Sequence, residues 1–466
     1  MKFVPPFNKS TLFIAFHKPF DIETEDGRIL ERKRRIALTA FTSTILKVLT
    51  MSVPLITLKI TYDYLNVEVY GLWSAIATFF ALFAFSDLGL GNGLQTKLSQ
   101  AYGKDNLELC RKIISNTFII LFFIACCLLI LFLFLFNFID WATLMNAQSN
   151  ETIIIASSIV FVIVIPKIIN IPISIIERTQ LALQEGFKSD IWNIFGYILN
   201  LISIVAIAYF DFGKITLLAF TSFLPLIVSA LNMFVYFTFQ KKELKLSLKL
   251  FDLKLSKNLL SLGVLFSILS ILSTAGLSMD TFIVARTCNL NEAASYSIIY
   301  RVVAIFSAVV AVLSAPLWGA NGEAIARGDI KWVEQNTKKM SLYMTSISVI
   351  LVILGLLLAK FIFKIWLGTN FEFSYLALLW LSILQILFSF ISPYFMVLNA
   401  LGEVRKQIVL FAIYTPIVFG LKYYFSLKYG VAVIPFLGMI LYLLIIVIGT
   451  YFFAIQSFKK LKSGKL

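Results

Sequence analysis

Residues 108–137 read ELCRKIISNTFIILFFIACCLLILFLFLFN, and no charged residue follows Lys112 in this stretch. A helix needs about 20 mainly apolar residues to cross the ~30 Å hydrocarbon core of a bilayer. An uncharged apolar run of this length therefore predicts a membrane-spanning helix. This one stretch sets the class of protein, because a chain that contains it has to be inserted in a membrane.

The same pattern recurs along the whole chain. Of the 466 residues, 59% are hydrophobic and 14% are charged, and the mean hydropathy is +0.90. No soluble protein of this length buries so much apolar surface. We therefore predict an all-α polytopic membrane protein with about twelve transmembrane helices. The expected spans lie near residues 37–61, 69–93, 108–137, 152–178, 187–209, 215–239, 259–285, 294–319, 341–363, 375–399, 408–427 and 431–455.

Lysine and arginine are distributed unevenly between the connections. If the N-terminus is cytoplasmic, the cytoplasmic connections hold about 30 basic residues and the opposite side about four, which are Lys214, Arg286, Lys364 and Lys428. Because cytoplasmic loops carry the excess of basic residues, both termini are predicted to be cytoplasmic. The net charge of +15 then reflects attraction to anionic lipid of the cytoplasmic leaflet.

Several other kinds of site are not expected. Nucleic-acid binding would need a folded domain with a contiguous basic face. The four cysteines have neither the spacing of a disulfide framework nor that of a zinc site. The only histidine, His17, lies in the N-terminal tail, so we expect no His-based catalytic or metal site. The same tail carries the charged run 31–35 before the first span, which predicts an uncleaved anchor and not a signal peptide.

A basic loop between the sixth and seventh spans divides the chain into two halves. Its alternation of lysine with leucine and phenylalanine predicts an amphipathic segment on the membrane surface. The expected parts are an N-terminal tail (1–35), an N-terminal six-helix lobe (36–240), the basic linker (241–258), a C-terminal six-helix lobe (259–455) and a basic tail (456–466).

The two halves resemble each other weakly. Residues 91–109 read GNGLQTKLSQAYGKDNLEL, and residues 316–334 read PLWGANGEAIARGDIKWVE. The offset of about 224 residues corresponds to six helices, and a repeat of an even number of helices keeps its orientation in the membrane. This similarity indicates a parallel repeat about an axis along the membrane normal.

Four basic residues, Lys47, Lys59, Lys167 and Arg301, lie inside the predicted spans. A charge at the bilayer centre costs roughly 2.5–3.5 kcal/mol even on insertion scales, so such residues need a polar environment. Lys47 lies on a stripe of threonine and serine, Lys167 shares a helix face with Asn170, and Arg301 lies on a stripe of small residues. Lys59 lies off the stripe near the outer interface, where we expect it to snorkel to the headgroups.

Acidic partners for these cations are few. Asp280 lies at about the depth of Arg301 and is the expected partner of that residue. Lys360 and Lys422 stand beside aromatic residues at the outer interface, where they are interpreted as ordinary anchors.

Amide side chains form two uncharged polar stripes. Asn193 and Asn200 share a face of the fifth span, and Gln385 and Asn399 share a face of the tenth. Such groups could bind sugar hydroxyls, or they could hold helices together at ~0.6 kcal/mol per hydrogen bond. Both interpretations stay open at this point.

The charge pattern as a whole predicts a cationic cavity. Lys47, Lys167 and Arg301 stand against at most Asp280 and Asp87. A hydrated cavity of net positive charge selects an anion, and ammonium and guanidinium groups suit a pyrophosphate. A negative cytoplasm favours the outward movement of an anion by ~2.3 kcal/mol per charge per 100 mV.

Residues 70–106, YGLWSAIATFFALFAFSDLGLGNGLQTKLSQAYGKDN, closely resemble the same region of bacterial polysaccharide biosynthesis flippases. The lead-in ERKRRIALT, residues 31–39, resembles a subgroup of those proteins. They translocate O-antigen and other lipid-linked oligosaccharides, and their superfamily of multidrug, oligosaccharidyl-lipid and polysaccharide exporters includes the multidrug and toxin extrusion (MATE) antiporters. The strong resemblance covers the first quarter of the chain, and the remainder agrees in helix count and loop sizes.

The resemblance implies a fold and a substrate. The fold would be MATE-like, with two six-helix lobes facing each other across a V-shaped cavity and access alternating between the two sides. The substrate would be an undecaprenyl-pyrophosphate-linked oligosaccharide, moved from the cytoplasmic to the periplasmic leaflet of the inner membrane. Membrane lipids and other polysaccharide assembly proteins would be partners. No cofactor is implied beyond coupling to a H⁺ or Na⁺ gradient or to the membrane potential.

The family-like element Ser86–Gly93 lies at the cytoplasmic end of the second span. We interpret Asp87 as part of a cytoplasmic gate, and the alternative is a helix-end charge that pairs with Lys97 or Lys104.

Two other functions compete with the flippase. A cation-coupled multidrug antiporter would share the fold but would need carboxylates in its cavity, and this chain offers more basic than acidic candidates there. A membrane-embedded polymerase or glycosyltransferase would need a catalytic constellation, usually on a large outer loop. The longest expected outer loop, near 138–151, carries only Asp140 and Glu151. The chain is therefore not expected to be an enzyme.

Overall fold

The computed structural model of the chain describes residues 25–81, 89–102, 106–326, 329–367 and 371–462. Within these ranges the regular secondary structure is helical, without a strand. The prediction of an all-α polytopic membrane protein is confirmed.

In the described part of the chain, nine helices are long and apolar enough to cross a membrane. A tenth span results if Ser267–Ser278 and Asp280–Thr287, which meet at a bend of 44°, form one broken span. The two other predicted spans also lie on helices. The expected span 69–93 falls on two helices of 13 residues, α3 (Val67–Phe79) and α4 (Leu90–Tyr102). The expected span 294–319 falls within the 37-residue helix α13 (Leu290–Ala326).

The chain forms two compact units that are not contiguous in sequence. Unit 1 contains Met1–Tyr64, Phe83–Ile139 and Ser158–Val264, and unit 2 contains Leu65–Leu82, Asp140–Ser157 and Leu265–Leu466. The lobes expected from the sequence have one boundary near the basic linker. The observed units therefore differ from those lobes at 65–82 and 140–157, which come from the N-terminal half but belong to unit 2.

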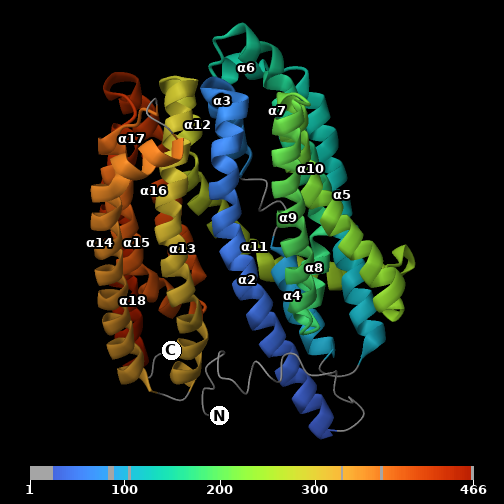
Figure 1. The fold of residues 1–466 in the computed structure, drawn as a ribbon. Helices are drawn as coiled ribbons and strands as arrows, with labels where there is room; N and C mark the ends of the chain where they lie inside the picture. The colour runs from blue at the N-terminus through green and yellow to red at the C-terminus, as the bar shows by residue number, and fades with distance from the viewer. Residues whose placement is uncertain (1–24, 82–88, 103–105, 327–328, 368–370, 463–466) are drawn as a thin grey trace. The chain divides into compact units, whose positions relative to one another are not determined.

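Unit 1 consists of most of the N-terminal helices (Figure 1), among which α9 packs along α10 and α4 packs on α5 and α8. Its helices are α2 (Glu25–Leu65, to Tyr64), α4, α5 (Leu107–Phe136), α7 (Asn150–Ile173, from Ser158), α8 (Ile175–Ala182), α9 (Gly186–Phe210), α10 (Lys214–Val235) and the first turns of α11 (Leu253–Ser278).

Unit 2 contains the remaining helices, and α15 lies against α13, α14 and α17 in it (Figure 1). Its elements are α3, α6 (Trp141–Leu144), most of α11, α12 (Asp280–Thr287), α13, α14 (Ile330–Leu367), α15 (Tyr375–Ala400), α16 (Val404–Tyr429), α17 (Val433–Leu441), the π-helical turn η5 (Tyr442–Val447) and α18 (Ile448–Lys462). Its core cluster of buried aromatic and aliphatic side chains is centred on Tyr394, Tyr414 and Tyr442.

Two local features set the position of α3 in unit 2. Asn66 has a left-handed backbone (φ 67°), and its side-chain oxygen accepts a hydrogen bond from the Val69 amide at 3.0 Å, which begins the helix. Gly71 then allows α3 to approach α13 closely, because a Cβ atom at this position would lie 1.8 Å from the Leu290 carbonyl oxygen. A small residue at such a crossing is typical of membrane helix packing.

The basic linker is pinned to α5 within unit 1. It contains two short 3₁₀ turns, Lys242–Leu244 and Leu248–Leu250. The Asn116 amide donates to the Leu250 carbonyl at 2.7 Å, and the Arg111 guanidinium donates to the Lys245 carbonyl at 2.8 Å. Through these two bonds the linker is held along the first turns of α5.

Candidate functional site

A buried ion pair joins α12 and α16 in unit 2. The Lys422 ammonium lies 2.5 Å from the Asp280 carboxylate, and the two residues are 2% and 4% exposed. The Tyr296 hydroxyl of α13 donates to the other carboxylate oxygen at 2.7 Å. Gly438 of α17 makes room for the cation, because a Cβ atom there would lie 3.1 Å from the ammonium nitrogen. Both charges thus have polar partners, as burial requires.

Two sequence-based expectations about this pair are wrong. Lys422 is not an interfacial anchor, since it lies in the core of unit 2. Asp280 is not the partner of Arg301, since Lys422 and Tyr296 occupy its oxygens. Lys422 directly precedes Tyr423 and Tyr424 in the sequence, and this aromatic pair is typical of a membrane interface. The better signal is helical spacing: Thr415, Lys422 and Ser426 are all buried on one face of α16.

Arg301 lies in a different environment in the same unit. Its guanidinium carbon lies 5.8 Å from the centre of the Tyr70 ring and 5.5 Å from that of Trp73, both on α3. The two rings meet edge to face at 5.5 Å. Electron-rich ring faces attract a cation without neutralising it. Within the described residues, no carboxylate lies within ion-pairing distance of Arg301.

This arrangement leaves the guanidinium able to bind an anion. The rings restrict the orientation of the planar group, and its N–H donors match the paired oxygens of a phosphate or carboxylate. The residues that hold it, Tyr70 and Trp73, come from the stretch that carries the family resemblance. The sequence predicts the cation at position 301 but not the rings beside it, because α3 and α13 are more than 200 residues apart.

The other two predicted cations lie in unit 1. Lys47 is exposed on α2, and Lys167 is half-buried on α7 directly after Pro166. Lys59 is exposed near the end of α2. That Lys47, Lys167 and Arg301 line one cavity stays a prediction.

The hydroxyl stripe of α2 is used largely within unit 1. Thr42 and Ser43 donate to the Asp190 carboxylate of α9 at 2.8 and 2.5 Å. Thr57 and Thr61 donate to backbone carbonyls of their own helix. Asp190 was not singled out from the sequence, and the pairing of two adjacent hydroxyls with it anchors α2 against α9.

The amide stripes make contacts between helices. Asn200 donates to the Thr221 carbonyl of α10 at 3.3 Å, and Asn399 accepts from Gln407 of α16 at 2.8 Å. Asn193 donates to Glu177 of α8 at 3.1 Å, and Gln385 is 4% exposed. For Asn200 and Asn399 these bonds agree with the helix-holding interpretation. A role of the four amides in sugar binding stays a prediction.

The remaining site residue, Asp87, lies outside the described residues. No group of three or more potential metal ligands occurs among the residues that the structure describes.

The charged run 31–35, near the start of α2, forms an ion-pair cluster with residues 185–188 within unit 1. Glu31 binds Arg34 at 2.7 Å and Arg35 at 2.9 Å, and Arg35 lies 3.6 Å from Glu185. Glu185 also binds Lys188 at 2.8 Å. Burial alone would raise the pKa of the Glu185 carboxyl, but hydrogen bonds and charges, those of Lys188 first, lower it below the usual value.

The sequence matches the profile of a known protein family. The profile of the polysaccharide biosynthesis protein family matches residues 38–316, which is more than half of the chain. No curated protein matches the sequence.

Solved structures show the fold. An inward-facing multidrug resistance MATE family transporter of the MOP superfamily superposes with a TM-score of 0.76 at 16% identity, over 89% of this chain and 96% of that one. An outward-facing MATE family transporter gives 0.65 at 14% identity, over 98% and 100%. A MOP superfamily transporter from Pyrococcus furiosus, described as having a binding pocket of reverse polarity, gives 0.65 at 16% identity, over 98% and 99%. The chain therefore has a MATE-like fold.

Proposed function

The chain belongs to the polysaccharide biosynthesis protein family, and we propose that it flips undecaprenyl-pyrophosphate-linked oligosaccharide repeat units from the cytoplasmic to the periplasmic leaflet of the bacterial inner membrane. The family and the transporter fold support a translocase of a lipid-linked saccharide. The orientation with both termini in the cytoplasm is part of this proposal and follows from the distribution of basic residues.

One observation carries the choice of an anionic substrate. Arg301 is a half-buried cation whose charge is met by the Tyr70 and Trp73 rings and by no carboxylate of the described residues. A cation in a membrane protein that lacks an acidic partner is a functional candidate. The pyrophosphate of the lipid carrier supplies the missing negative charge, and Lys47 and Lys167 provide further cations along its route.

The buried ion pair supplies a coupling element in this proposal. In this proposal Asp280 is the coupling residue, because its carboxylate holds α12 to α16 through Lys422. A transport cycle coupled to a proton gradient needs a group of this kind, and the membrane potential adds ~2.3 kcal/mol per exported charge per 100 mV.

The test replaces Arg301 by glutamine. A charge-assisted hydrogen bond contributes about 1.5–3 kcal/mol, so we expect export to fall about 10- to 100-fold. Lys47→Ala should impair export as well. The measurement is the amount of lipid-linked oligosaccharide that remains in the cytoplasmic leaflet of cells and the amount of protein inserted in the membrane.

Lys59→Gln is the matched control, because Lys59 is an exposed cation of a spanning helix that the proposal places at the headgroups. It should leave export unchanged. If both Arg301→Gln and Lys47→Ala export at the wild-type level, with normal amounts of protein in the membrane, the proposal of a cationic cavity is refuted.

A second candidate is a cation-coupled multidrug antiporter, and the buried carboxylate of Asp280 favours it. Here Asp280→Asn should abolish the efflux of a cationic dye, whereas Arg301→Gln should not affect it. In the flippase, by contrast, Arg301→Gln is the variant that loses export, and no cationic dye is transported.

A further inference from the structure

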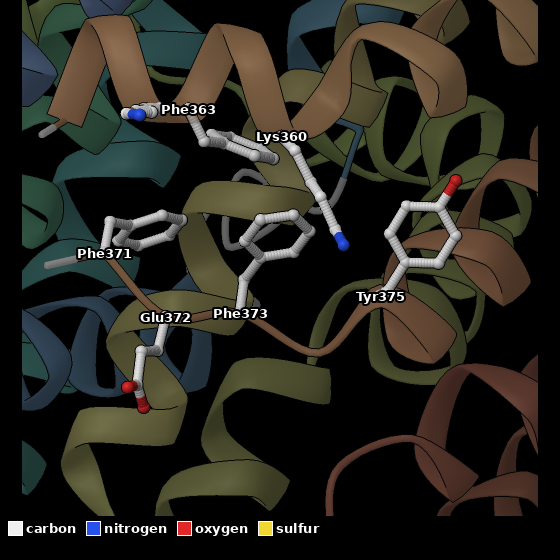
Figure 2. A pocket seen from close by; sticks show the side chains of 7 residues that line it. Lys360, Phe363, Phe371, Glu372, Phe373 and Tyr375 are labelled. Carbon is white, nitrogen blue, oxygen red and sulfur yellow. The ribbon is translucent and has the colours of Figure 1, made fainter. Parts of the chain in front are cut away.

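A cavity of about 580 Å³ lies where α14 ends and α15 begins, within unit 2 (Figure 2). Three rings form its floor: the Phe363 ring lies 5.3 Å from Phe371 and 4.7 Å from Phe373, and Phe371 stacks on Phe373 at 5.9 Å. Phe363 is 2% exposed, so this aromatic floor is anchored in the unit. The cavity is therefore built on packed side chains.

Charged residues surround the aromatic floor. Lys360 and Lys364 are both exposed and lie one helical turn apart on α14. Figure 2 shows the Lys360 ammonium directed to the space between the Phe373 and Tyr375 rings, whereas the Glu372 carboxylate points away from it. Among the residues that the structure describes, neither lysine forms an ion pair. The cavity thus presents two ammonium groups that pair with no carboxylate of the described part of the chain.

The surroundings of the cavity are suited to lipid. The neighbouring side chains on α14 are apolar and exposed, with Leu357 at 74%, Phe361 at 63% and Ile365 at 67%. Tyr375 is 41% exposed, and its hydroxyl donates to the Leu356 carbonyl at 3.0 Å. Exposed tyrosine and lysine beside a band of apolar side chains mark the headgroup level of a bilayer. A lipid could place its acyl chains on the apolar band and its headgroup in the cavity.

We propose that this cavity binds the phosphate of a lipid in the leaflet opposite the basic connections. Lys360 and Lys364 pair with the phosphate oxygens, and the aromatic floor covers the apolar side of the headgroup. Lysines that merely snorkel to the interface anchor a span without selecting a position for any lipid. Here the walls of the cavity fix where the phosphate lies, so the cavity acts as a defined lipid site. The same chemistry is shared by an anionic phospholipid and by the polyprenyl phosphate carrier that the proposed function implies.

The experiment places the photocrosslinking residue p-benzoylphenylalanine at position 375 of the full-length protein. The protein is reconstituted in vesicles with equal amounts of phosphatidylglycerol and phosphatidylcholine, and mass spectrometry gives the ratio of the two lipids cross-linked. A basic residue near the surface favours anionic lipid about fivefold, so two should favour phosphatidylglycerol by about 5- to 25-fold over the ratio found with the crosslinker at Leu357. Lys360→Gln with Lys364→Gln should return the ratio to that control value.

Lys428→Gln is the matched control, since Lys428 is an exposed cation at the end of α16 that lies over the Tyr429 ring and outside the cavity. It should not change the ratio. The proposal is overturned if positions 375 and 357 give equal ratios, if the double lysine variant keeps the preference, or if soluble glucuronate removes the lipid cross-link, which would indicate a carbohydrate site.

A third arm separates the two sources of lipid phosphate. Undecaprenyl phosphate is added as a minor component of the vesicles. If the carrier is the ligand, its fraction among the cross-linked lipids should exceed its fraction in the vesicles. If bulk phospholipid is the ligand, the two fractions should be equal. This experiment measures the binding of lipid and not export. A negative result would therefore leave the Arg301 export test of the proposed function unaffected.

Discussion

Replacing Lys422 by methionine should destabilise the protein by about 3–5 kcal/mol, because the substitution leaves the Asp280 carboxylate buried without its cation. Methionine has a length similar to that of lysine and no charge, so it fills the same space between α12 and α17. The Tyr296 hydroxyl still donates to Asp280 in this variant, but a single neutral hydrogen bond does not replace the lost charge.

The magnitude follows from the geometry. At the observed 2.5 Å, and with an effective dielectric constant of about 20, two unit charges attract each other by about 7 kcal/mol before desolvation is subtracted. Both side chains are almost fully buried, at 2% and 4% exposure, so the desolvation of each charge is large. Removing both charges removes the desolvation cost of each. The double variant, Asp280→Asn with Lys422→Met, should therefore recover most of the stability lost by Lys422→Met alone.

The assay is the thermal denaturation of the purified protein in detergent. For a unit of roughly 200 residues, a loss of 3–5 kcal/mol lowers the Tm by about 6–20 °C. Lys428→Met, an exposed lysine of the same helix, should change the Tm by less than about 2 °C. The reasoning fails if Lys422→Met is as stable as Lys428→Met, or if the double variant is no more stable than the single one.

Two further predictions concern packing and pH. Gly71→Ala should lower the Tm strongly, because its methyl group would lie 1.8 Å from the Leu290 carbonyl oxygen, whereas Gly196→Ala, whose added atom would lie 3.4 Å from Val228, should have little effect; equal Tm values for the two variants would contradict the close approach. Glu185 has a lowered pKa, so its stabilisation is present above its ordinary pKa of about 4.5 and is lost as the pH falls through the lowered value. Glu185→Gln should therefore lower the Tm at about pH 7, and this Tm difference should shrink as the pH falls below about 4.5 and through the lowered pKa; a Tm difference that stays constant in acid would contradict the lowered pKa.

Much of the fold could be predicted from the sequence because membrane insertion leaves a strong local signal. The apolar runs and the basic loops are each visible within a window of about 20 residues. Helix class and approximate boundaries were therefore accessible without knowledge of tertiary contacts.

The candidate site was only partly accessible for the opposite reason. The partners of its charges are distant in sequence: Asp280 and Lys422 are 142 residues apart, and the rings beside Arg301 come from α3. Hydropathy reports the depth of a lysine but not whether its side chain points to lipid or to the core. Lys422 was misassigned because its aromatic neighbours in sequence suggested an interface, whereas the face of α16 that it shares with Thr415 and Ser426 is buried.

The inclusion of α3 in unit 2 has a consequence for biosynthesis. Gly71 leaves the ribosome about 220 residues before Leu290, the residue whose carbonyl it approaches. At about 5–20 residues per second, α3 waits roughly 10–45 s for its partner helix to be made. During that interval α3, whose Leu72 and Ile76 are fully buried in the finished protein, lacks the packing of α12 and α13. The N-terminal half is therefore not a finished module to which a second half is added, and a nascent chain released at the basic linker should be a substrate for quality-control proteases.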